Sequence, residues 1–418
     1  MDNRKQRGLA VLAGCLAACM GGYAAPSAAQ EDDSKNPFSF TASETVMRDS
    51  NLYRLPNGVD APKGKRSDTV SVTKIGVNFD KELSRQGFHA GVSASRSFYA
   101  IHKNLTNTGG DANAQWNWRI GDRLSGVLGY SYGESFVGFS NTYTTNSVDQ
   151  KRVMRQLGRA RFSLDYWWHP DWAVGLGFSD VRNDYRDKLR EYDKYDAQEA
   201  SVNFTYRPST GNRIVLSFRG EEGQYSNRAK KSELAPGETS LRDWSQRDVR
   251  LSGQWKLSDV TQLNGYAGYT QRKYDLASNR DFNGLMGKIE FHWVPTGKAV
   301  IDLSWRREVG ADQDAVSNYA VTQGWSLRPT WVITQKVRLG VSGEYLKRTY
   351  GGDAGQVTPG TYYHPRDAKT LSYGATLQYL PVPSASIALG YQNEKRDAKE
   401  KIYDYRAHSV FLSGSITF

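Results

Sequence analysis

The chain has 418 residues, of which 38% are hydrophobic and 24% charged, with a mean hydropathy of −0.65 and a formal net charge of +11. This composition excludes a helical membrane protein, because no stretch after the N-terminal segment approaches the roughly 20 apolar residues of a spanning helix. The basic residues are spread along the chain and not clustered on one element, so nucleic acid is not an expected partner.

Residues 1–29 have the organisation of a secretory signal peptide. Arg4, Lys5 and Arg7 form a positive n-region, residues 8–18 are apolar, and a small-x-small sequence ends at Ala29. We expect cleavage after Ala29, which leaves residues 30–418 as an exported outer-membrane β-barrel.

Both cysteines of the chain, Cys15 and Cys19, lie inside this N-terminal segment. A mature chain without cysteine suits an oxidising periplasm. The sequence Leu16-Ala17-Ala18-Cys19 also resembles a lipoprotein box, so lipidation of Cys19 stays open as an alternative.

The last residues alternate in character up to a C-terminal phenylalanine. Val410, Leu412, Ile416 and Phe418 take one face of an extended chain, and serine and threonine take the other. In a bacterial outer-membrane barrel one face of each strand meets lipid and the other a polar lumen. The pattern predicts the last strand of such a barrel. Phe418 resembles the signal by which the barrel-assembly machinery recognises its clients.

Short turn signals alternate with longer polar stretches along the rest of the chain. From Asp68 onward this gives seventeen strands, and single-chain bacterial barrels have even numbers. Residues 37–46 alternate in the same way and supply the missing strand. The predicted fold is therefore all-β: a transmembrane antiparallel up-and-down β-barrel of about 18 strands, with sixteen as the next count. Residues 49–67 form the first external loop, and both termini are periplasmic.

Residue parity predicts which side chains face the lumen. An Arg that faces lipid at the bilayer midplane costs about 2 to 4 kcal/mol, so Arg155, Arg159 and Arg161 must lie opposite Phe162 and Leu164. The same argument gives the full set of substrate-path candidates: Arg155, Arg159, Arg161, Arg213, Arg219, Arg250, Arg306, Arg328 and Arg338.

Two interpretations of these arginines stay open. Inward Arg and acidic residues can pair across strands and stiffen the wall, each pair contributing little. Alternatively, the surplus of Arg forms a path for an anionic solute, because guanidinium binds carboxylate bidentately and keeps its charge.

The N-terminal part of the mature chain also carries a family resemblance. Residues 38–44 and 49–56, with 66–72 and 80–86, resemble the start of EpsL-type outer-membrane proteins encoded with exopolysaccharide operons, part of a wider group of β-barrel porins. The resemblance implies export of a polysaccharide, neutral or anionic, across the outer membrane, with other secretion-system proteins as partners. It supplies no catalytic motif.

Other functions are weighed against this one. A general or anion-preferring porin for small solutes would share the fold and the charge. An enzyme, a metal site or a cofactor is not expected, because none of the six histidines has catalytic or metal-ligand spacing. A soluble β-propeller would need four short strands in each interval of roughly 40 to 45 residues, whereas two long strands are predicted there.

Overall fold

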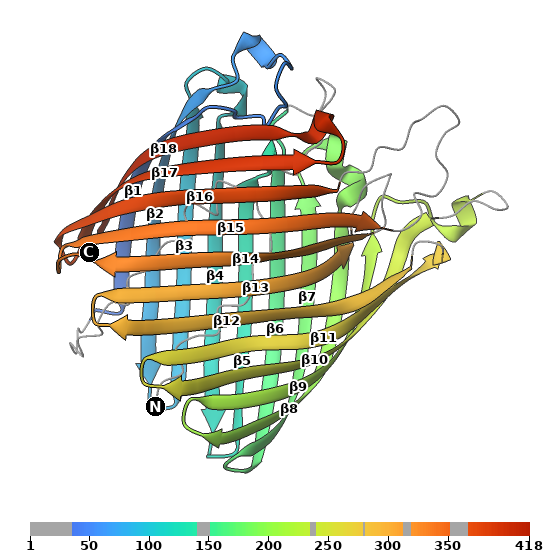
Figure 1. The fold of residues 1–418 in the computed structure, drawn as a ribbon. Coiled ribbons are helices and arrows are strands. Elements are labelled where there is room, and N and C mark those ends of the chain that lie inside the picture. The colour runs from blue at the N-terminus through green and yellow to red at the C-terminus, as the bar shows by residue number, and fades with distance from the viewer. Residues whose placement is uncertain (1–35, 140–150, 235–239, 279–280, 312–318, 352–366) are drawn as a thin grey trace.

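Eighteen antiparallel strands follow one another around a closed barrel (Figure 1). The computed structural model describes residues 36–139, 151–234, 240–278, 281–311, 319–351 and 367–418. The strands are β1 (Phe38–Asp49), β2 (Asp68–Leu83), β3 (Gln86–Tyr99), β4 (Asn107–Ile120), β5 (Leu124–Phe136), β6 (Met154–His169), β7 (Trp172–Tyr185), β8 (Tyr195–Ser209), β9 (Asn212–Tyr225), β10 (Ser240–Ser258), β11 (Thr261–Leu276), β12 (Phe282–Thr296), β13 (Ala299–Ala311), β14 (Tyr319–Val332), β15 (Val337–Gly351), β16 (Ala368–Val382), β17 (Ala385–Ala398) and β18 (Tyr405–Thr417). Short 3-10 helices lie between some of them: η1 (Pro62–Gly64), η2 (Lys103–Leu105), η5 (Lys188–Asp193), η6 (Lys231–Glu233) and η8 (Lys401–Tyr403).

No helix in the described part of the chain is long and apolar enough to cross a membrane.

The first and last strands close the barrel. β1 pairs with β18 from Thr41 opposite Thr417 to Asp49 opposite Ser409, and β1 pairs with β2 on its other side. The Phe418 amide donates to the Phe40 carbonyl at 2.9 Å, so the pairing continues to the last residue. Closure leaves no row of unpaired backbone groups, as a sheet surrounded by hydrocarbon requires. The predicted count of eighteen strands, including the strand before Asp68, is confirmed.

The two ends of the barrel differ. At one end, called the turn end, successive strands are joined by two to four residues, and Gly121 and Gly211 adopt φ values of 59° and 91° there. Only glycine takes such positive φ readily. At the other, the loop end, the connections have five to eighteen residues. β1 begins and β18 finishes at the turn end, so the first and last described strands start and end beside the short turns.

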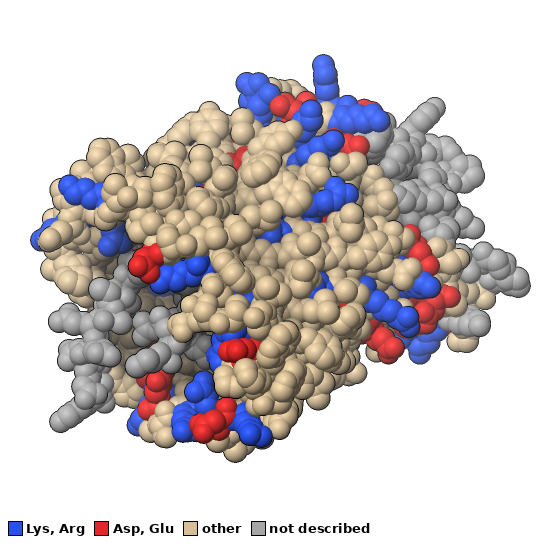
Figure 2. Space-filling view, turned by 60° about the horizontal axis from the view of Figure 1, so that its bottom comes forward, with Lys and Arg blue, Asp and Glu red and all other residues tan. Residues whose placement is uncertain are grey.

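The outer surface of the barrel is an apolar belt. Large hydrophobic side chains with exposed fractions such as 63% for Val92, 68% for Leu285 and 53% for Leu389 alternate with smaller or polar inward residues. Figure 2 shows one side of the molecule on which uncharged residues dominate, while charged groups gather toward the two ends. An exposed apolar surface of this extent is the lipid-facing wall of a transmembrane barrel.

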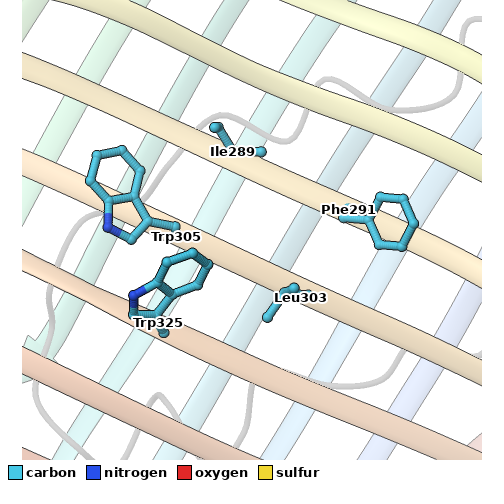
Figure 3. Close-up of a pocket in the computed structure, with 5 residues that line it drawn as sticks. All are labelled: Ile289, Phe291, Leu303, Trp305 and Trp325. Atoms are coloured by element: carbon cyan, nitrogen blue, oxygen red, sulfur yellow. The ribbon is translucent and has the colours of Figure 1, made fainter.

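A shallow apolar groove lies on this lipid-facing wall between β12, β13 and β14 (Figure 3). Ile289, Phe291, Leu303, Trp305 and Trp325 line it, and the two indole rings are 6.4 Å apart between centroids. All five positions have outward parity, so the groove opens to lipid and not to the lumen.

Glu44 is an outward-facing exception to the apolar belt. Glu44 lies on the same face of β1 as Phe40 and Val46, which are exposed at 44% each. Its carboxylate accepts hydrogen bonds from Ser71 and from Thr73, the latter at 2.5 Å, so the charge is partly satisfied by neighbouring hydroxyls. On a barrel exterior an acidic group costs less than Arg or Lys does.

Several strands continue into polar segments of the sequence. Residues 222–225 belong to β9, and residues 240–245 belong to β10. Likewise, residues 182–185 belong to β7. Strands that extend beyond the hydrocarbon are polar on both faces, so the alternation disappears before the strand ends.

The parity rule gives a test of membrane placement. Replacing Ile289, in the middle of the outward stretch of β12, with Arg should lower the free energy of unfolding by about 2 to 4 kcal/mol, because it places a guanidinium in hydrocarbon. The measurement is urea unfolding in lipid bilayers, followed by tryptophan fluorescence. Asn264→Arg is the matched control, because Asn264 is directly opposite the inward Glu290. Equal destabilisation by both changes would contradict the assignment of faces.

Candidate functional site

Contacts between side chains on strands two apart identify the inner face. Arg161 of β6 donates to Gln115 of β4, Lys74 of β2 pairs with Asp111 of β4 at 3.0 Å, and an Arg–Glu pair joins β13 to β15. Such contacts reach over an intervening strand, which is favourable only on the concave side of a curved sheet. The polar parity therefore faces the lumen, and the exposed apolar parity faces outward.

The register places all nine predicted arginines on the lumenal parity, and they fall into two groups. Arg219 pairs with Asp248 and lies 3.2 Å from Glu199, and Arg306 lies 3.2 Å from Glu344. These two arginines are parts of wall-stiffening ion pairs.

The other predicted arginines form no ion pair with the described residues within 4 Å. The three on β6 form a row. In this row the Arg155 Nε donates to Asn183 at 2.5 Å, Arg161 donates to Gln115, and Arg159 is exposed to the lumen. Neutral amides hold these guanidinium groups without cancelling their charge. Arg250 instead lies 4.3 Å from the centre of the Tyr266 ring.

The remaining three arginines are spread along other strands. Arg213 donates to the Thr205 hydroxyl at 3.4 Å. Arg328 is directly opposite Asp302 in the register, but the Asp302 carboxylate is 2.6 Å from His292. Arg338 is opposite the neutral Gln378. The structure thus distributes the nine candidates around β6 to β15 and does not gather them at one point.

In the other half of the lumen, hydroxyl groups are concentrated on β1, β3, β5, β16 and β18, with one on β17, and these positions together form the hydroxyl-rich wall. On β1, for example, four consecutive inward residues are Ser39, Thr41, Ser43 and Thr45. The inward positions of β2 and β4 are instead mainly charged or amide residues. The inward hydroxyl residues of this wall are Ser39, Thr41, Ser43, Thr45, Ser93, Ser95, Ser97, Ser125, Ser131, Ser135, Thr370, Ser372, Thr376, Ser386, Ser409, Ser413, Ser415 and Thr417. The lumen therefore has an arginine-rich wall and a hydroxyl-rich wall. The prediction considered only the first, although the Ser and Thr alternation was visible in the sequence.

The first loop, residues 50–67, packs onto the inner face at the loop end. Leu52, Tyr53 and Leu55 are at most 5% exposed and form an apolar cluster with the inward residues Val70 and Tyr99. Burial raises the pKa of Tyr53 to about 12. The sequence prediction treated this segment as an ordinary external loop. The group of apolar residues within this loop was the feature of the sequence that could have indicated its inward packing.

Buried polar groups fix this loop in place. The Asn51 side chain donates to the Leu55 carbonyl at 2.8 Å and to the Arg406 carbonyl at 3.0 Å, and accepts the Leu55 amide at 3.0 Å. Asp49 accepts the Asn51 amide at 2.8 Å and pairs with Arg54 at 2.9 Å. Arg54 has a φ of 55°, an uncommon value for a non-glycine residue, which these contacts maintain.

A second apolar cluster lies at the same end, across β7 to β12. It contains Tyr225, Trp244, Tyr274 and Phe282, each at most 6% exposed, and the Arg272 guanidinium lies 3.6 Å from the centre of a Trp244 ring. These residues have inward parity, so bulky side chains from two sides reduce the opening at the loop end.

Four of the described histidines lie beside carboxylates. His102 Nδ1 is 2.9 Å from Asp68 in a fully buried pair that also anchors the loop-end cluster. Within the described ranges, no group of three or more His, Cys, Asp or Glu is arranged to hold a metal ion. The predicted signal peptide and Cys19 lie outside the described residues.

Comparisons with known proteins give one family match over part of the chain and several solved structures of low sequence identity. Residues 222–418, from the end of β9 to the C-terminus, match the family described as "Putative beta-barrel porin 2". No curated protein matches the chain. Among solved structures, OpdK of Pseudomonas aeruginosa with vanillate is similar at 11% identity and a TM-score of 0.48, over 91% of this chain and 99% of that chain. The siderophore receptor PirA of Acinetobacter baumannii is similar at 6% identity and a TM-score of 0.44, over 92% and 81% of the two chains.

The anchoring of the first loop can be tested at Asn51. Asn51→Ala removes three buried hydrogen bonds and leaves backbone groups without partners, at about 1 to 3 kcal/mol for each group. We expect trypsin to cleave the loop after Arg54 or Lys65 at least about tenfold faster, while the strands stay resistant. Asn57→Ala is the matched control, because Asn57 is exposed in the same loop. Equal cleavage rates in both variants would show that Asn51 does not hold the loop.

Proposed function

We propose that the chain forms an outer-membrane channel for hydrophilic solutes, with a preference for anions. The turn end faces the periplasm and the loop end faces outward. A barrel of eighteen strands is too wide for its side chains to fill and leaves an aqueous passage. Its inner face is mainly polar outside the two apolar clusters at the loop end, and its outer face suits lipid.

The observation that carries the anion preference is the row of Arg155, Arg159 and Arg161 on β6. These guanidinium groups face the lumen, contact neutral amides where they contact a neighbour, and form no ion pair with the described residues. A guanidinium that keeps its charge in a low-dielectric wall attracts carboxylate or phosphate groups. Arg219 and Arg306, which are already paired, contribute to the rigidity of the wall instead.

The charge of the β6 row is tested by planar-bilayer conductance in a KCl gradient. The variant R155Q/R159Q/R161Q should shift the reversal potential toward lower anion selectivity, with unchanged heat-modifiable mobility on gels. The control K347Q/K369Q/R406Q removes the same number of positive charges from outward positions, and its selectivity should stay that of the wild type. Unchanged selectivity in the first variant would refute the electrostatic path.

A second candidate is export of a polysaccharide, as the resemblance to EpsL-type proteins implies. The hydroxyl-rich wall favours it, because short Ser and Thr side chains exchange hydrogen bonds with sugar hydroxyls without binding them tightly. An anionic polymer would place its carboxylates along the β6 row and its hydroxyls along the hydroxyl-rich wall, which begins on the neighbouring strand β5. Other secretion-system proteins would deliver the chain at the periplasmic end, and Phe418 would direct the barrel to the assembly machinery.

Deletion of the coding gene separates the two candidates. Export predicts loss of secreted polymer together with polymer accumulation in the periplasm. Complementation with the wild-type gene should restore secretion. If secretion is unchanged while uptake of small anionic solutes falls, the polymer role is wrong and the solute channel remains.

A further inference from the structure

Four cations point outward from the loop ends of four consecutive strands, β15 to β18. Lys347 is directly opposite Lys369, and Lys395 is directly opposite Arg406. We call these four residues the outward cation row. Like charges directly opposite one another on one face of a sheet destabilise it. Two such pairs lie side by side here, and an anion bound to them would relieve the repulsion.

The acidic residues nearby do not balance this charge. Asp397 is opposite Lys369 in the register, but its carboxylate is 2.7 Å from the Lys395 ammonium group. It is the one acidic side chain at an outward position of these four strands. Asp367 and Asp404, in the adjoining loops, accept the backbone amides of Tyr350 and Ala398. Lys347, Lys369 and Arg406 form no ion pair with any described residue.

The row lies immediately beyond the lipid-facing belt. Tyr345 and Leu371, exposed at 42% and 45%, are two residues closer to the turn end than Lys347 and Lys369 on the same face. On β17 and β18 the belt ends at Tyr391 and Val410. Amphipathic aromatic side chains mark the level where hydrocarbon meets headgroups. The cations are therefore at the height of lipid headgroups and can extend toward them.

We propose that the outward cation row binds the phosphate of an anionic lipid headgroup in the leaflet at the loop end. Continuity with the apolar wall favours a lipid, because acyl chains can cover the belt while the headgroup meets the cations. Each Lys or Arg near an anionic surface adds to the attraction, so several act together. This site is on the outside of the barrel and does not depend on what passes through the lumen.

The test compares purified barrels in nanodiscs of phosphatidylglycerol and of phosphatidylcholine. For the wild type, phosphatidylglycerol should raise the thermal midpoint, and native mass spectrometry should show retained phosphatidylglycerol. In K347Q/K369Q/R406Q, retention of this lipid should fall by about tenfold or more, with the stabilisation lost. Lys395 is kept, because it pairs with Asp397. The lumenal variant R155Q/R159Q/R161Q is the matched control and should bind lipid as the wild type does.

Additional measurements distinguish lipid binding from binding of other molecules and from misfolding of the variants. K347R/K369R should keep lipid retention, because it preserves the charge. Inorganic phosphate added in phosphatidylcholine nanodiscs should not reproduce the stabilisation, and doing so would overturn the lipid assignment. A dimer that forms in phosphatidylcholine and disappears in the Gln variant would assign the row to a second copy. Equal behaviour of the wild type in both lipids would overturn the proposal even if the Gln variant does not fold.

Discussion

The constraint behind this structure is that hydrocarbon offers no hydrogen-bond partner to a peptide group. Every backbone N–H and C=O in the membrane must pair within the protein, and a sheet can achieve this only by closing on itself. The pairing of β1 with β18 is therefore as necessary as any other in the barrel. Once the sheet is closed, each residue is assigned to lipid or lumen by parity alone, and its chemistry follows from that assignment.

The alternation of residues along each strand gives the barrel an outer face that suits lipid and an inner face that suits water. Outward positions are apolar across the membrane apart from Glu44, and on β15 to β18 they become cationic where headgroups begin. Inward positions divide into an arginine-rich half on β6 to β15 and a half in which hydroxyl groups are concentrated on β1, β3, β5, β16 and β18. Because paired arginines such as Arg219 stiffen the wall while unpaired ones such as Arg159 remain available, total lumenal charge is a poor guide to how the channel treats a solute.

The fold could be predicted from sequence because its signals are local. Alternation over eight to ten residues identified the strands, the even-number rule located β1, and the cost of a guanidinium in lipid fixed the direction of Arg155 and its neighbours. The pairing of individual arginines could not be predicted, because it depends on the register between strands. The inward packing of the first loop could not be predicted either, because the Asn51 side chain donates a hydrogen bond to the carbonyl of Arg406, 355 residues away in the chain.

That contact connects the start of the domain to its end. Ser50 and Asn51 hydrogen-bond to the backbone of His408 and Arg406, so the first loop is attached to the last strand beside the seam. The first loop cannot reach its final conformation until β18 has paired with β1, although the ribosome synthesises the loop long before it synthesises β18. The first loop therefore becomes ordered only after the barrel has closed. The loop end is narrowed at that late stage and not earlier in folding.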